Sequence, residues 1–488
     1  MTKILSLAHI RLMSLLDKLN SEQYEAVTTT DGPVLLLAGA GSGKTRVIVY
    51  RIAHLIEEKQ IRPDRILAVT FTNKAAEEMK NRVKSLIAPE RLSPPPQIST
   101  FHSLCVRILR RDIDKLVFEG QTKNYTKDFT IYDTDDQLKV IKGCMKDLNI
   151  DQKMIAPKVI QSSISSAKSK GLSWENMHST AVEYGSDLKR EATTRVYKMY
   201  QERLMTVNAL DFDDLLLKTV LLLRNSNETR LRYNERFQYI MIDEYQDTNP
   251  PQFALVRLLT EVQQNLCVVG DPDQSIYKFR SADIQNILDF EKHYPRAKTI
   301  KLLKNYRSTQ NILEAANEVI RNNKQRREKD LHTDNEKGEK LRYYQAFDGD
   351  NEASFVADRI KRHLADDPNT RCVILYRTNA QSRLFEEGCR RASLRYNMIG
   401  GFSFYERAEI KDIIAYLKFL LNPNDDVALS RIINTPPRGI GKATLEAIQT
   451  TATLNKISHW DAIKIIVEEE SAGRGANALR SFCKTIER

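Results

Sequence analysis

One short glycine-rich segment constrains this chain more than any other. An apolar run at residues 34–37 leads into Ala-Gly-Ala-Gly-Ser-Gly-Lys-Thr at 38–45, and a helical pattern follows at once. Small residues let backbone N–H groups turn inward around phosphate oxygens at a helix N-terminus. We therefore predict a phosphate-binding loop in which Lys44 reaches the β- and γ-phosphates and Thr45 ligates Mg²⁺. The remaining loop residues of this prediction are Ala40, Gly41, Ser42 and Gly43. A glycine-rich turn with an unrelated lysine is the alternative, and the flanking strand and helix patterns argue against it.

A second segment supplies the acidic partner that such a loop requires. The apolar residues 239–242 run directly into Asp243 and Glu244. We predict that Asp243 holds Mg²⁺ through water and that Glu244 orients and deprotonates the attacking water. Two carboxylates after an apolar run could equally be a solvated strand end. Together with the glycine-rich loop, they predict ATP and Mg²⁺ as the cofactors.

The rest of the chain alternates between apolar runs and helical patterns, which predicts an α/β fold with parallel sheets. One block has strand-like runs at 34–38, 66–70, 239–242 and 266–269, and a second block has them at 298–303, 341–347 and 372–376. Two stretches have helical patterns and are predicted to be helical insertions, one from about 113 to 208 and one after about 381. The first contains no convincing run for a buried strand. The pattern predicts two α/β units with helical additions.

Charge and composition bear on partners and location. The 75 Lys and Arg outnumber the 64 Asp and Glu, which gives a formal charge of +11 and favours a polyanionic partner. The 6 cysteines form no CxxC pair, so neither a zinc site nor a disulfide framework is expected. Charged residues interrupt the amphipathic N-terminus, and nothing resembles a signal peptide or a membrane span. We expect a cytoplasmic protein with no membrane partner.

Further motifs, in a characteristic order, resemble those of superfamily 1 DNA helicases of the UvrD/Rep/PcrA type. They are residues 19–23 (LNSEQ), 70–76 (TFTNKAA), 100–103 (TFHS), 210–215 (LDFDDL), 243–249 (DEYQDTN), 269–277 (VGDPDQSIY), 305–309 (NYRST), 377–383 (RTNAQSR) and 400–407 (GGFSFYER). Each string is short, but together they are spread along nearly the whole chain from Leu19 onward. The resemblance implies an ATP-dependent DNA helicase or translocase, moving 3′-to-5′ on single-stranded DNA in DNA repair or replication.

The resemblance also implies a domain plan and a nucleotide site. Two RecA-like domains would clamp ATP, the first at 1–112 and 209–287, the second, incomplete, at 288–380. Helical insertions would occupy 113–208 and 381–488. Gln274 would join Lys44 and Glu244 in catalysis, and Arg307 would serve as an arginine finger. The nucleotide base would be contacted by Gln23, Arg46 and a stacking Tyr306.

For DNA, the resemblance implies aromatic faces for bases and polar groups for phosphates. The stacking residues would be Phe71, His102, Tyr277 and Phe279. The backbone would be held by Asn73, Arg280, Arg377 and Asn379. Each aromatic taken singly could instead be core, most of all Phe71 and Phe101, and Phe279 stands where related proteins usually carry Trp. Residues 435–441 resemble a Gly-x-Gly hairpin for duplex phosphates, although an ordinary helix–turn–helix joint is nearly as good an interpretation. The expected partners are single-stranded DNA, single/double-strand junctions, and repair or replication proteins.

Two final motifs of the family do not occur in this sequence, one a Thr-x-His-x-x-Lys-Gly-Leu-Glu type and one ending near Thr-Arg. We therefore expect an incomplete second RecA-like domain, with weak or absent unwinding by this chain. The alternative function is an ATP-regulated DNA-binding module without unwinding. An RNA-directed helicase or one associated with a recombination nuclease is a more distant option, and no nuclease-type cluster of carboxylates and lysine follows the helicase motifs.

Overall fold

The computed structural model describes residues 16–116, 124–177, 188–323, 326–327, 329–399, 408–455, 457–469 and 474–486. The chain forms two compact units, Met1–Lys337 with Asp412–Arg488, and Gly338–Lys411. Motif residues 400–407 lie outside the described residues. Among the described residues, no helix has both the length and the apolar character needed to cross a bilayer.

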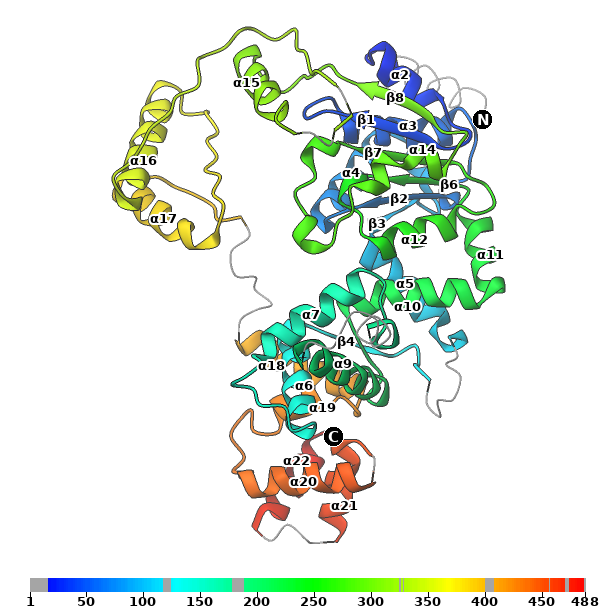
Figure 1. The fold of residues 1–488 in the computed structure, drawn as a ribbon, viewed down its shortest axis with the longest axis vertical. Coiled ribbons are helices and arrows are strands. Elements are labelled where there is room, and N and C mark those ends of the chain that lie inside the picture. The colour runs from blue at the N-terminus through cyan, green and yellow to red at the C-terminus, as the bar shows by residue number, and fades with distance from the viewer. Residues whose placement is uncertain are drawn as a thin grey trace. The chain divides into compact units, whose positions relative to one another are not determined.

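A six-stranded sheet organises the larger unit, with strand order β3-β2-β6-β7-β1-β8 and every neighbouring pair parallel (Figure 1). The strands are β1 (Val34–Ala38), β2 (Ile66–Thr70), β3 (Gln97–Thr100), β6 (Tyr239–Ile242), β7 (Leu266–Gly270) and β8 (Lys298–Leu302). Because all six run the same way, the loops that follow them emerge at one edge. The motif segments after β1, β2, β3, β6, β7 and β8 are therefore brought to the same edge of the sheet.

Alternate side chains of each strand feed two separate cores. Leu35 and Leu37 join one cluster with α5 (Phe101–Asp112), α10 (Phe212–Asn225) and α12 (Pro250–Leu259). Val34 and Leu36 join the other with α2 (Ser21–Thr28), α3 (Lys44–Glu57) and α4 (Asn73–Leu86). A parallel sheet covered on both faces explains why its strands read as unbroken apolar runs. The predicted α/β class is confirmed.

The segment between α5 and α10 is mainly helical, as predicted. Its elements are β4 (Thr130–Tyr132), α6 (Thr134–Asp147), α7 (Pro157–Ser169), α9 (Leu188–Thr206) and, leading into α10, β5 (Ala209–Asp211). The expectation of no buried strand between residues 113 and 208 was wrong, because β4 pairs in parallel with β5. A three-residue strand is too short to show a period in the sequence.

The helices described after residue 407 have their own apolar core, which includes Phe419, Trp460 and Phe482. They are α18 (Ala408–Leu421), α19 (Asp426–Ile432), α20 (Lys442–Asn455), α21 (His459–Glu468) and α22 (Arg474–Ile486). Tyr132 Oη donates to Asp425 Oδ1 at 2.8 Å, which ties this group to the insertion. Residues 435–441 form the joint between α19 and α20.

In the second block of predicted strands the first run was correct, and the other two were wrong. Residues 298–303 do contain a strand, β8, but it pairs with β1 of the first sheet. In the smaller unit, residues 341–347 and 372–376 are not strands, and Tyr343 and Phe347 are 89% and 98% exposed. An extended segment becomes a strand only when a neighbouring segment hydrogen-bonds to its backbone. Among the described residues 338–399, no segment pairs with either run in this way. This unit contains the helices α16 (Gly349–Asp366) and α17 (Ser382–Arg391), while α15 (Gln310–Ile320) follows β8 in the larger unit.

Candidate nucleotide and nucleic-acid site

The glycine-rich loop joins β1 to the N-terminus of α3. Gly41 and Gly43 adopt φ of +67° and +89°, which suits glycine, and Gly43 is the N-cap of α3. A glycine cap brings no side-chain acceptor, so the first amides of α3 stay available to an anion. The turn is fixed from inside, because Ser42 Oγ donates to Gly39 O at 2.8 Å. Lys44 and Thr45 follow as the first residues of the helix.

Glu244 and Lys44 meet across the site. Lys44 Nζ lies 2.8 Å from Glu244 Oε2 and 3.0 Å from Oε1. Glu244 follows β6 in the left-handed region, at φ +51°, and this turn directs the carboxylate back toward the loop. Two motifs separated by 200 positions thus converge as predicted.

The carboxylates beside this pair are buried. Desolvation and, second, the Glu244 charge raise the pKa of Asp243 to about 6, and the same two causes raise that of Asp247 to about 6. Asp247 Oδ1 is buried without a hydrogen-bond partner. Carboxylates crowded in this way gain from a divalent cation, which favours oxygen ligands. The donor set of Lys44, loop amides, Thr45 and Asp243 therefore fits a magnesium–nucleotide complex.

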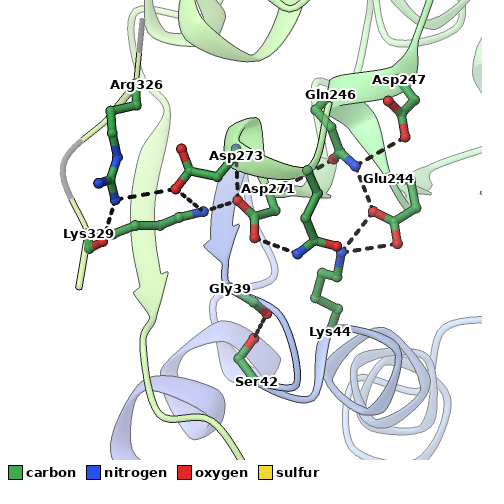
Figure 2. Close-up of polar contacts among 11 residues, drawn as sticks. Gly39, Ser42, Lys44, Glu244, Gln246, Asp247, Asp271, Asp273, Arg326 and Lys329 are labelled. Atoms are coloured by element: carbon green, nitrogen blue, oxygen red, sulfur yellow. Dashed lines mark hydrogen bonds and ion pairs between the residues drawn. The ribbon is translucent and has the colours of Figure 1, made fainter. Parts of the chain in front are cut away.

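A hydrogen-bonded path leads from Glu244 to the segment after β7 (Figure 2). Gln246 Nε2 donates to Glu244 Oε2 at 2.8 Å, and Gln246 Oε1 accepts from the Asp271 amide at 2.9 Å. Asp271 Oδ2 accepts from Gln274 Nε2 at 2.5 Å. Gln274 was predicted from the sequence, whereas Gln246 and Asp271 were missed. Both residues lie inside motifs already identified in the sequence, DEYQD and GDPDQ, and this position could have indicated a role in the site.

The segment after β8 lies directly against the glycine-rich loop. Asn305 Nδ2 donates to Ala40 O at 2.7 Å, and the Tyr306 amide donates to Gly41 O at 3.0 Å. A Cβ at Gly41 would lie 2.7 Å from Asn305 Nδ2 and 2.8 Å from the Cβ of Arg307. The close approach requires glycine and sets Arg307, which is exposed, beside the loop.

The three residues expected at the nucleotide base have other partners in the structure. Gln23 is buried, and its Nε2 donates to Ser42 O at 2.9 Å. Tyr306 Oη accepts from Asn20 Nδ2 at 3.0 Å, and Arg46 Nη2 donates to Lys18 O at 3.3 Å. Gln23 thus braces the loop, and contact of these three residues with a base stays a prediction.

Aromatic rings gather at the same sheet edge, beyond the nucleotide residues. Phe71, after β2, stacks on Tyr277 with centroids 5.9 Å apart and planes at 17°. Tyr277 contacts Phe279 at 5.9 Å, and the Arg280 guanidinium lies 5.3 Å from the Tyr277 centroid. Phe279 is 72% exposed, so this row is a surface rather than core. Phe101 is buried, and for that residue the core interpretation was correct.

A second aromatic pair lies at the start of α5 and α10. His102 contacts Phe212 edge-on at 5.7 Å, and burial lowers the pKa of His102, which favours its neutral ring. Phe212 is 51% exposed; its motif was recognised, but its side chain was not singled out. Asn73 begins α4 nearby, where its Oδ1 lies 3.5 Å from Thr100 Oγ1. Arg377 and Asn379 belong to the smaller unit, and their DNA contacts remain predictions.

The glycine-rich loop, the acidic pair after β6 and the parallel sheet define a P-loop protein, with an exposed aromatic row at the same edge of the sheet. The chain belongs to the UvrD/REP helicase family: the family's N-terminal domain model matches residues 19–295, and the UvrD-like helicase C-terminal domain model matches 300–470. The predicted resemblance is confirmed.

Several curated relatives are similar over most of this chain. The ATP-dependent DNA helicase PcrA of Bacillus subtilis (strain 168) is 50% identical over 480 residues, 97% of this chain and 62% of the relative. The proteins of the same description from Staphylococcus epidermidis (strain RP62A) and Staphylococcus aureus (strain Mu50) are 50% and 49% identical over 451 residues, 92% of this chain and 60% of theirs. The chain therefore spans about 60% of the length of these relatives.

Proposed function

We propose that the protein is an ATP-dependent DNA helicase, in which hydrolysis drives 3′-to-5′ movement along single-stranded DNA during repair or replication. The observation that carries the proposal is the continuous path from Lys44 through Glu244, Gln246 and Asp271 to Gln274. Gln274 begins the short segment that also contains Tyr277, the centre of the aromatic row. One stretch of chain thus touches both candidate sites.

Hydrolysis needs a base for water and positive charge for the phosphates. In this proposal Lys44 and the first amides of α3 hold the β- and γ-phosphates. Thr45 and Asp243 would hold Mg²⁺, which would supply further positive charge. Phosphate oxygens compete with Glu244 for the Lys44 ammonium. The released Glu244 carboxylate then takes a proton from the water, whose oxygen bonds to the γ-phosphorus while the bond to the β–γ bridging oxygen breaks and ADP leaves. Arg307, beside the loop, meets the charge that spreads over the transferring group.

DNA binding in this proposal relies on stacking and charge. Phe71, Tyr277 and Phe279 offer ring faces, and Arg280, which lies beside the Phe279 ring, would meet phosphates. Ring faces accept any base, so binding should not depend on base sequence, and it should weaken steeply as salt rises. His102 and Phe212 extend the stacking surface. The partners proposed are single-stranded DNA and its junctions with duplex.

Coupling follows from the shared segment after β7. A change of contacts at the γ-phosphate alters Gln274, and Gln274 shares its short segment with Tyr277 and Arg280. Nucleotide and DNA should therefore change each other's affinity by the same factor.

Strand separation is the experiment that tests this proposal. Duplexes carrying a 3′ tail, a 5′ tail or no tail are incubated with the protein and ATP, and released strands are measured. The 3′-tailed duplex should be separated first, however slowly, and only with hydrolysable ATP. ATP-modulated DNA binding with neither DNA-stimulated hydrolysis nor strand release from any substrate would instead identify a DNA-binding module. Preference for the 5′ tail would refute the proposed direction.

A further inference from the structure

A short segment after α15 contacts the candidate nucleotide site at two places, the glycine-rich loop and the segment after β7. We call Arg326, Arg327 and residues 329–332 the strap. Its far end pairs in parallel with the segment just after β8 and reaches the glycine-rich loop. The Asn305 amide donates to His332 O at 2.7 Å, and Leu331 occupies the space that a side chain at Gly39 would need. Its near end lies on the segment after β7 (Figure 2). The strap thus touches both halves of the candidate site.

Lys329 makes the innermost contact of the strap. Its ammonium pairs with Asp271 Oδ1, and the side chains of both residues are only 3% exposed. Asp273 Oδ2 lies 3.5 Å from Lys329 Nζ and 3.3 Å from Arg326 Nη2. A buried carboxylate keeps its orientation when a cation and further donors occupy both of its oxygens. Asp271 has this arrangement, because Lys329 and the Asp273 amide bind Oδ1 and Gln274 binds Oδ2.

This geometry makes Lys329 the outer end of the path that orients Gln274. Without the ammonium, the buried Asp271 carboxylate would rotate toward other donors, and the Gln274 side chain would lose its fixed acceptor. The Asp271 main chain also anchors Gln246, the residue that binds Glu244. Displacing these groups by a fraction of an ångström affects a transition state far more than it affects binding of the substrate.

We propose that Lys329 is a positioning residue for hydrolysis: through Asp271 it holds Gln274 in place, so that DNA bound at the aromatic row accelerates turnover. The inference rests on the proposed ATPase function and deepens it. Among the described contacts, Lys329 touches neither Lys44, which would meet the phosphates, nor Glu244, which would meet the attacking water. Its effect should therefore appear in kcat and not in nucleotide affinity.

The test is steady-state ATP hydrolysis with and without saturating oligo(dT). Lys329→Met should lower the DNA-stimulated kcat about 10- to 100-fold, the cost of a misplaced catalytic group. The KM for ATP should stay within about threefold, because ground-state binding is untouched. Arg327→Met is the matched control, since Arg327 lies on the same strap but pairs with Glu291 Oε2 at 2.7 Å. It should keep the parental rate.

A double variant separates positioning from simple neutralisation of a buried charge. Lys329→Met leaves the Asp271 carboxylate buried without its cation, which should lower the unfolding temperature. The double variant Asp271→Asn/Lys329→Met removes that unpaired charge. Its unfolding temperature should therefore return toward the parental value, while its kcat stays low. Recovery of kcat together with stability would overturn the inference, as would an unchanged kcat in Lys329→Met. A parent that does not hydrolyse ATP would overturn the proposed function itself, and this inference with it.

Discussion

Removing the Tyr277 ring should weaken binding of single-stranded DNA by a predictable amount. The ring lies between Phe71 and Phe279, each with its centroid 5.9 Å away, and Arg280 lies against it. Loss of one stacking face costs about 1–3 kcal/mol per base. At about 1.4 kcal/mol per tenfold change, Tyr277→Ala should raise the Kd about 5- to 150-fold.

Fluorescence anisotropy with a labelled oligo(dT) at fixed ionic strength measures this change. Tyr277→Phe keeps the ring and should bind within about twofold of the parent, because stacking uses the π-face and not the hydroxyl. Tyr24→Ala removes an exposed tyrosine on α2 and serves as the control. The slope of log Kd against log salt should not change in Tyr277→Ala, since the phosphate contacts remain. A Kd within twofold of the parent for Tyr277→Ala would refute the stacking assignment.

Two further predictions concern buried charge. Lys168 Nζ lies 2.6 Å from Asp211 Oδ2 and 2.9 Å from Asp214 Oδ2. Because Lys168→Met leaves both buried carboxylates without their cation, it should lower the free energy of unfolding, measured by urea titration, by about 3–5 kcal/mol. A loss below about 1 kcal/mol would contradict this prediction. Asp243 has its pKa raised from 3.8 to about 6, so the folded state binds its proton more tightly and the carboxylate lowers stability progressively as pH rises through 6. Asp243→Asn should therefore stabilise the fold by up to about 3 kcal/mol at pH 8 and by less at pH 5, while weakening Mg²⁺-dependent nucleotide binding. An equal gain at both pH values in thermal unfolding would contradict the pH dependence, and a larger gain at pH 5 would contradict its sign.

The parts of the site that the sequence predicted well are those written in consecutive residues. The loop around Lys44 and the Asp243–Glu244 pair each follow an apolar strand, and parallel strands must deliver their ends to one edge. That rule brings the two segments to the same edge, where Lys44 Nζ and Glu244 Oε2 lie 2.8 Å apart. Phe71 and Tyr277 were predicted as DNA contacts, and the structure shows that they stack on each other.

The parts that the sequence did not predict depend on which distant segments become neighbours. An extended apolar pattern indicates a strand only if a partner is present, so residues 298–303 could not be distinguished from 341–347 by pattern. The first found β1 as its neighbour, and the second remained exposed. The pairing of Lys329 with Asp271 spans 58 positions, and a lysine among charged neighbours reads as a surface residue. The bond from Gln23 Nε2 to Ser42 O was likewise not predicted, and the contact of Gln23 with a nucleotide base stays a prediction.

The most direct test of the account is to compare nucleotide binding with hydrolysis in the parent, Lys44→Ala and Glu244→Gln. Binding is measured with a fluorescent ATP analogue and Mg²⁺, and phosphate release is measured with and without oligo(dT). The parent should bind nucleotide and hydrolyse it faster when DNA is present. Glu244→Gln should bind like the parent and not turn over, whereas Lys44→Ala should lose both properties. Hydrolysis by either variant at the parental rate, or a parental rate indifferent to DNA, would contradict the claim that this site is a DNA-coupled ATPase.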